Sequence, residues 1–190
     1  MSLSIIVSRF NEDITWTRQF PNVIIYNKGN ALHDTYNEIF LDNVGREGHT
    51  YYKYICDNYD NLSDYTVFLQ GNPFDHSPNI LTNLNTYLNT KELRIDFEFL
   101  SEHVIHSSID IECNMNWQCK NIHKNWELLF GRSSSNQECI FGAGAQFIVS
   151  KHRILQRTKE FYETIVKMLE YTIDPIEGHD IERFHKYIFN

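Results

Sequence analysis

The sequence predicts one α/β domain over residues 1–190, with a mostly parallel central sheet flanked by helices. Two observations favour this fold class: short apolar runs typical of buried strands, and amphipathic segments between them with short connections. Composition agrees, because 42% of the 190 residues are hydrophobic and 14% are aromatic. A chain of this length and composition can bury one core, packed largely by rings.

The first half alternates strands with helices. Strands are expected at 3–7, 23–26 and 65–69, where the runs are apolar or β-branched and end at turn-forming residues. A helical turn is expected at 14–19, and helices at 46–59 and 79–88, where apolar residues recur three or four positions apart. Asn43 is the expected cap of the first helix.

The second half is less regular before it becomes ordered again. Alternating apolar residues predict a strand over 95–99, followed by a short helix at 126–130 and a loop at 131–136. Small residues lead into a strand within 139–149, and Ser150 is placed to cap a helix that begins at Lys151. Helices are expected at 158–171 and 178–185, with Phe184 and Ile188 facing inward.

Charge and cysteine usage exclude several classes. The formal net charge of −8 would repel a polyanion, which disfavours nucleic-acid binding but allows a small phosphorylated ligand. The four cysteines form no CxxC pair and match no zinc module, so free thiols in a reducing compartment are expected. No signal peptide precedes the first strand, and no apolar run is long enough to span a bilayer. A cytoplasmic location follows, the host cytoplasm if the source is viral.

Polar side chains gather where the first three predicted strands end. They occupy residues 9–13, 27–28 and 70–76. Because the carboxyl ends of parallel strands share one edge of a sheet, we expect a common cleft there. Arg46, at the start of a helix, has the donor geometry for phosphate, although residues 43–47 can equally be a plain helix cap. Neither nucleotide-binding glycine loop is present, which disfavours a P-loop or dinucleotide fold.

Several stretches carry candidate ligands, each with an ordinary structural alternative. Asp75 and His76 offer a carboxylate and an imidazole to a divalent ion, or a turn cap beside a solvated ring. The acidic pairs 96/98 and 110/112 would share a strand face, either binding an ion or facing solvent. Small residues at 142–145 let a ligand approach the backbone, and Gln146 can read a hydroxyl; tight packing is the alternative.

The last predicted helix carries a further cluster. His179, Asp180, Glu182 and His185 either close over the cleft or form an exposed helical face.

These stretches together resemble a small domain family without a known function, found in bacteria, fungi and large DNA viruses. The resemblance covers residues 4–85 and 139–188. It rests on the segments SRFNED, YNKG, NVGRE, FLQGNP with His76, and GAQF. More distantly, the layout is similar to GT-A type glycosyltransferases, which use a nucleotide-sugar and usually a divalent metal. Compact capsid glycosyltransferases of chlorella-type viruses are one such group.

The second resemblance implies a GT-A-like, Rossmann-related domain that moves a sugar from a UDP-sugar donor to a glycan or glycoprotein acceptor with Mn²⁺ (or Mg²⁺). The usual Asp-x-Asp is absent after the third strand, where residues 70–76 stand instead. The implied nucleotide-binding residues are Arg9, Asn11, Glu12, Lys28 and Arg46. The implied sugar-binding residues are Gln70, Gly144 and Gln146, and the implied metal ligands are Asp75 and His76. The candidate bases of an inverting reaction are Glu12, Asp110 and Glu182.

Two other functions are compatible with the same cleft. One is a metal-dependent hydrolase in which Asp75, His76 and a late histidine hold the ion. The other is a non-catalytic carbohydrate-binding module, because the chain carries eleven tyrosines that can contact sugar rings.

Overall fold

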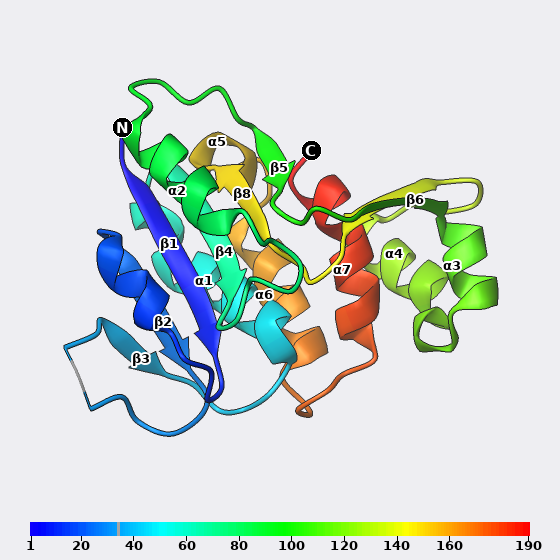
Figure 1. Ribbon diagram of the computed structural model, residues 1–190. Coiled ribbons are helices and arrows are strands. Elements are labelled where there is room, and N and C mark those ends of the chain that lie inside the picture. The colour runs from blue at the N-terminus through cyan, green and yellow to red at the C-terminus, as the bar shows by residue number, and fades with distance from the viewer. Residues whose placement is uncertain (34) are drawn as a thin grey trace.

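A six-stranded sheet in the order β3–β2–β1–β4–β8–β5 forms the centre of the computed structural model, which describes residues 1–33 and 35–190 (Figure 1). Its strands are β1 (Leu3–Arg9), β2 (Val23–Asn27), β3 (Glu38–Phe40), β4 (Tyr65–Gln70), β5 (Phe97–Phe99) and β8 (Phe147–Ser150). β1 pairs in parallel with β2 and β4, and β2 pairs in parallel with β3.

The other half of the sheet corrects the expectation of a mostly parallel arrangement. β8 runs antiparallel to both β4 and β5, so the sheet is mixed. The reason lies in the approach to β8. Phe147, its first residue, pairs with Phe68 near the end of β4, so the chain enters β8 from the edge where β4 leaves the sheet.

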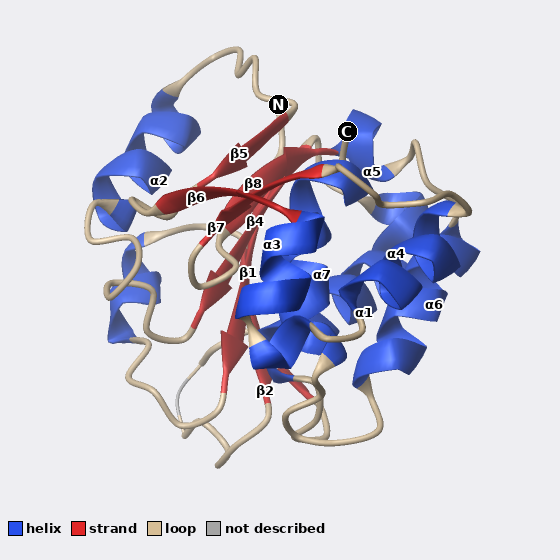
Figure 2. Ribbon diagram, turned by 90° about the vertical axis from the view of Figure 1, so that its right-hand side faces the viewer, coloured by secondary structure: helices blue, strands red, loops and turns tan. Residues whose placement is uncertain are grey.

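Helices cover both faces of the sheet (Figure 2). On one face lie α1 (Arg46–Asn58), α6 (Lys159–Leu169) and α7 (Glu177–Ile188), and on the other lie the short helix η1 (Thr15–Gln19) and α2 (Ile80–Asn89). Alternation along β1 separates the two cores, because Ile6 packs toward α1 whereas Ile5 and Val7 pack toward α2. The core beneath α1 and α7 is ring-rich as expected, with Phe147 5.0 Å from Phe68 between ring centroids.

A smaller lobe extends from one side of the sheet, at the right of Figure 1. It contains the two-stranded ribbon of β6 (Val104–Ser108) and β7 (Glu138–Gly142), with α3 (Ile109–Met115), η3 (Trp117–Cys119) and α4 (Ile122–Phe130). One expectation is confirmed here and one is wrong. Small residues do lead into a strand, β8, although β7 before them belongs to the other sheet. The acidic pair 110/112 lies in the first turn of α3 instead of on a strand.

Several helices begin at a side-chain cap. Thr158 accepts a hydrogen bond from the Phe161 amide at the start of α6, and Ser150 does the same for Arg153 in α5 (Lys151–Ile154). The prediction of Asn43 as the cap of α1 is wrong, because Gly45 occupies that position with a φ of 64°. α1 is followed by the single turn η2 (Tyr59–Asn61). Across the described residues, no helix combines the length and apolarity that a bilayer crossing requires.

Candidate functional site

Three parallel strands end at one edge of the sheet, and a polar residue stands at each end. Arg9 at the end of β1 pairs with Asn27 at the end of β2, and Ser8 pairs with Gln70 at the end of β4. Such edges are where open α/β sheets bind ligands. The structure brings the three ends together around one cleft, as the sequence predicts.

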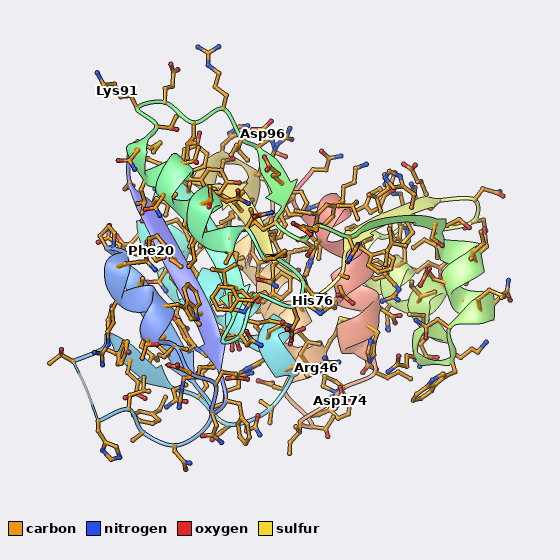
Figure 3. All side chains as sticks on the ribbon, viewed as in Figure 1. Phe20, Arg46, His76, Lys91, Asp96 and Asp174 are labelled. Carbon is orange, nitrogen blue, oxygen red and sulfur yellow. The ribbon has the colours of Figure 1, made fainter. Side chains whose placement is uncertain are left out.

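We call this depression the large cleft, with a volume of about 550 Å³. It is lined by Ser8, Arg9, Phe10, Glu12, Lys28, Asn43, Arg46, Glu47, Gln70, Asn72, Asp75 and Ile173. Figure 3 shows Arg46 and His76 at this end of the molecule with Asp174 beside them, whereas Lys91 and Asp96 lie at the opposite end.

Arg9 is built into the wall of the large cleft and is only 8% exposed. Its Nη1 donates to Oδ1 of Asn27 at 2.8 Å and to the Asn30 carbonyl at 2.9 Å, and its Nε donates to the Glu12 carbonyl at 3.0 Å. The guanidinium therefore ties together the loops that follow β1 and β2. Within the described residues only its Nη2 donors lack a protein acceptor.

Lys28 has a similar structural role. Its ammonium donates to the carbonyls of Val44 and Arg46, which fixes the turn that enters α1. Burial lowers the pKa of Lys28 to about 8, and the nearby Glu47 carboxylate opposes that shift. An ammonium with two of its three donors used is a fixed positive group at the wall of the cleft.

The entrance to α1 is conformationally strained. Gly45 and Arg46 have φ values of 64° and 47°, in the left-handed region. A Cβ at position 45 would lie 2.5 Å from the Cβ of His49 and 2.8 Å from the carbonyl of Leu169, so glycine is required there. Arg46 has no such freedom and pays a strain of about 1 kcal/mol. Strained residues of this kind are concentrated at functional sites, and Arg46 lines the large cleft.

Glu12 also lines the large cleft. Its Oε2 accepts hydrogen bonds from the amides of Phe10 at 2.7 Å and Asn11 at 3.2 Å. The carboxylate lies so close to Gly71 that a Cβ there would be 2.6 Å from Oε2. The glycine after β4 therefore makes room for Glu12 beside Gln70.

A second depression, which we call the small pocket, adjoins the large cleft. Its volume is about 220 Å³, and it shares Arg46, Glu47 and Gln70 with the cleft. Its other lining residues are Gly45, Gly48, His76, Gly144, Ala145, Gly178, His179, Ile181, Glu182 and His185. The first turn of α1 and one side of α7 both border it.

Glu182 is the best-placed carboxylate of the small pocket. Its Oε1 accepts a hydrogen bond from the Gly144 amide at 3.0 Å, and its Oε2 lies 3.4 Å from Nη1 of Arg183. Burial raises the pKa of Glu182, and the neighbouring Glu47 carboxylate raises it further, whereas Arg183 lowers it. The late cluster of acidic and imidazole residues therefore borders the pocket, with one exception. Asp180 is buried elsewhere and accepts a hydrogen bond from Asn125 at 2.6 Å.

The two sugar-binding candidates Gly144 and Gln146 have different roles. Gly144 lines the small pocket with a φ of 81°, whereas Gln146 is fully buried and lines neither depression. The amide of Gln146 donates to the Pro73 carbonyl at 3.1 Å. It therefore positions the loop that carries Asp75 and His76, and direct contact with a sugar stays a prediction without geometric support.

The two expected metal ligands separate. Asp75 lines the large cleft and His76 lines the small pocket. In residues 1–33 and 35–190 no group of three or more His, Cys, Asp or Glu side chains is close enough to hold an ion.

Two further candidates lie outside both depressions. Oδ1 of Asn11 accepts a hydrogen bond from the Asn30 amide at 2.9 Å, so this side chain joins two loops. Asp110 lies in the side lobe on α3, where it accepts from the Asn136 amide at 2.9 Å.

Ser134, His123 and Asp110 lie close together in the order of a catalytic triad, but their exposure does not suit catalysis. Nδ1 of His123 lies 2.8 Å from the hydroxyl of Ser134, and Nε2 lies 3.4 Å from Asp110. A nucleophilic serine must be reachable, yet Ser134 is 2% exposed while the Asp110 side chain is 44% exposed. The three residues instead fasten the loop after α4 to α3.

Sequence reasoning did not assign roles to Phe10, Glu47 or Ile173, all of which line the large cleft. The only available signal was their proximity to assigned residues: Phe10 lies between Arg9 and Asn11, and Glu47 follows Arg46. Ile173 gives no local signal. The loop that carries it reaches the cleft because the carbonyls of Thr172 and Ile173 accept from the amides of Gly45 and Arg46, a contact between distant parts of the chain.

The family of the chain is shown by a family model described as "Protein of unknown function (DUF3431)", which matches residues 5–190. The chain belongs to this family, consistent with the first resemblance found in its sequence. Neither the curated proteins nor the solved structures gave a match.

Proposed function

We propose that the chain is a glycosyltransferase that transfers a sugar from a UDP-sugar donor to a glycan acceptor. One observation carries this proposal. Most of the residues that the GT-A resemblance assigns to nucleotide, sugar and metal line two adjoining depressions. The loop after β1 and the loop after β4 border the large cleft, and the 144–145 turn borders the small pocket that shares part of its lining.

In this proposal the large cleft takes the nucleoside diphosphate. Lys28 and Arg46 supply positive charge, and the first turn of α1 supplies a helix-dipole end suited to phosphate. Phe10 is 49% exposed at the lining and offers a flat apolar surface to a base. Asn11, which the sequence also suggests, is not needed for this binding.

The transferred sugar then occupies the small pocket, and the bond to the diphosphate breaks at the junction lined by Arg46 and Gln70. Arg46 is placed to stabilise the charge that develops on the leaving diphosphate. Of the three candidate bases, Glu182 fits best, because a carboxylate with a raised pKa accepts a proton more readily. Glu12 is the alternative from the large cleft, and Asp110 is too remote to act.

A requirement for Mn²⁺ or Mg²⁺ is a separate prediction within this proposal. Such an ion would bind through Asp75 together with diphosphate oxygens. The steps assigned to Arg46, Lys28 and Glu182 do not depend on it.

Thermal unfolding with UDP, GDP and CMP, each with and without Mn²⁺, tests the proposal. A nucleotide at 100 times its Kd stabilises the folded state by about 2.7 kcal/mol, which raises the melting temperature measurably. We expect UDP to raise it in wild type and to do so less in Arg46→Met. Arg94→Met is the matched control, because its side chain is 83% exposed in a loop far from the cleft.

No response to any nucleotide, with or without Mn²⁺, would contradict the proposal. Product analysis then identifies the reaction. Turnover that depends on an acceptor supports transfer, whereas free sugar or phosphate released from the donor alone indicates a hydrolase. Glycan binding without nucleotide affinity indicates a carbohydrate-binding module.

A further inference from the structure

One buried side chain in the wall of the small pocket has polar atoms without partners. His185 lines the pocket and is 1% exposed, and neither of its ring nitrogens has a hydrogen-bond partner among the described residues. Because buried polar atoms are nearly always hydrogen-bonded, two unpartnered ring nitrogens in the wall of a pocket indicate a polar ligand.

His185 offers hydrogen bonds without offering charge. Its ring packs against Phe147 with 4.6 Å between centroids, and burial lowers its pKa to about 3. A neutral imidazole presents one donor and one acceptor, a combination that matches hydroxyl groups. Burial also lowers the pKa of His179, a second lining residue.

The lining of the pocket carries more negative than positive charge. Two carboxylates, Glu47 and Glu182, belong to the lining, and Arg46 is the one lining residue in the described structure with a permanent positive charge. Arg46 stands at the junction with the large cleft. Its guanidinium is already 3.9 Å from Glu47 and 3.6 Å from Asp174. Arg183, 3.4 Å from Glu182, does not line the pocket and is already paired with Glu112 at 2.6 Å. A carboxylate brought deep into the pocket would therefore meet Glu182 without a free cation among the described lining residues to offset it.

We propose that the small pocket selects an uncharged sugar and rejects one that carries a carboxylate, with His185 as a specificity-determining residue that binds a sugar hydroxyl. The inference rests on the proposed function and narrows its donor. A pocket of about 220 Å³ with neutral donors and two carboxylate acceptors suits a monosaccharide with free hydroxyls. A uronic acid of the same size would face like-charge repulsion.

Matched donors test the inference directly. UDP-glucose and UDP-glucuronic acid differ only at C6, as do UDP-galactose and UDP-galacturonic acid. We expect calorimetry to show the neutral donor binding at least about tenfold more tightly than its acid in one pair or both. The inference is overturned if an acid binds as tightly as its neutral partner, or if neither neutral sugar adds affinity beyond UDP itself.

Two variants separate the contributions. Glu182→Gln keeps an oxygen for the Gly144 amide but removes the charge, so we expect the preference for the neutral donor to fall severalfold. His185→Phe keeps an aromatic ring beside Phe147 but removes both nitrogens, so the sugar should lose its added affinity while UDP binds unchanged. His152→Phe, at an exposed position on α5, should change neither. A preference for the neutral donor that is undiminished in Glu182→Gln would contradict the electrostatic explanation.

The outcome can be told apart from failure of the proposed function. If UDP does not bind, the nucleotide assignment is wrong, and the pocket is tested alone by saturation-transfer NMR with methyl glucoside and methyl glucuronide. Contact with the glucoside that His185→Phe abolishes, without contact with the glucuronide, upholds the inference. Equal contact, or contact with neither, overturns it.

Discussion

The ring of His76 lies directly against Gly144, so that a Cβ at position 144 would be 2.4 Å from the ring Cδ2. The contact joins the loop after β4 to the turn between β7 and β8, the two segments that meet at the small pocket. It is possible only because Gly144 has no side chain and has a φ of 81°. A single glycine therefore determines how closely these segments approach.

The first prediction follows from this contact. Gly144→Ala should lower the free energy of unfolding by about 2–3 kcal/mol, because it adds a clash with His76 to the strain of a left-handed alanine. Gly131→Ala is the matched control, since its φ is 64° but no atom lies within 4 Å of its added Cβ. It should lose only about 1 kcal/mol in urea unfolding. Equal losses in the two variants would show that the contact is not tight.

Arg9 gives the second prediction. Arg9→Met should destabilise the protein by about 2–3 kcal/mol, because it removes three hydrogen bonds from a charged, buried donor. The Glu12 carbonyl then has no other donor among the described residues, whereas Oδ1 of Asn27 and the Asn30 carbonyl keep one each. Arg94→Met, on an exposed side chain, should stay within about 0.5 kcal/mol of wild type. Chemical denaturation measures both. A loss in Arg9→Met no larger than in the control would mean that Arg9 is free for ligand instead of holding the loops.

The strain at Arg46 gives the third prediction. Arg46→Gly should raise the free energy of unfolding by up to about 1 kcal/mol, because glycine adopts a φ of 47° without cost. The same variant should weaken UDP binding, since the guanidinium is lost. Asn136→Gly, with a φ of 58° outside both pockets, is the control and should leave UDP binding unchanged. An unchanged affinity for UDP in Arg46→Gly would show that the Arg46 side chain does not contribute to UDP binding.

The fourth prediction concerns acid stability. The pKa of His185 is about 3 in the folded state and about 6.5 in the unfolded chain, so the unfolded chain binds more protons between these values. The free energy of unfolding is therefore highest above about pH 6.5, where the ring is neutral in both states. It falls as the pH decreases through this window, by about 2 kcal/mol at about pH 5.

His185→Phe lacks this titration. Its free energy of unfolding relative to wild type should therefore rise by about 2 kcal/mol between about pH 6.5 and pH 5 in parallel denaturation series. An unchanged difference across that range would show that His185 is accessible to protons in the folded protein.

Elements with strong local signals could be predicted from the sequence. The apolar runs of β1, β2 and β4 and the amphipathic pattern of α6 are confirmed, because buried strands and one-sided helices impose their own periodicity. Short elements could not be found this way. β3 has three residues, of which two are exposed, so no apolar pattern marks it. α3 follows β6 without a break, and its acidic first turn reads equally as the polar face of a strand.

In the candidate site, too, some features follow from local sequence and others from tertiary packing. Local sequence determined that polar residues end β1, β2 and β4, and parallel pairing then necessarily places those ends at one edge, as Arg9 opposite Asn27 shows. Tertiary structure alone decided which candidate side chains line a depression. Gln146 turns inward to hold Pro73, Asp75 and His76 face different depressions, and Glu182 reaches the Gly144 amide from 38 positions away. Side-chain direction depends on packing between distant segments, and no local pattern in the chain records it.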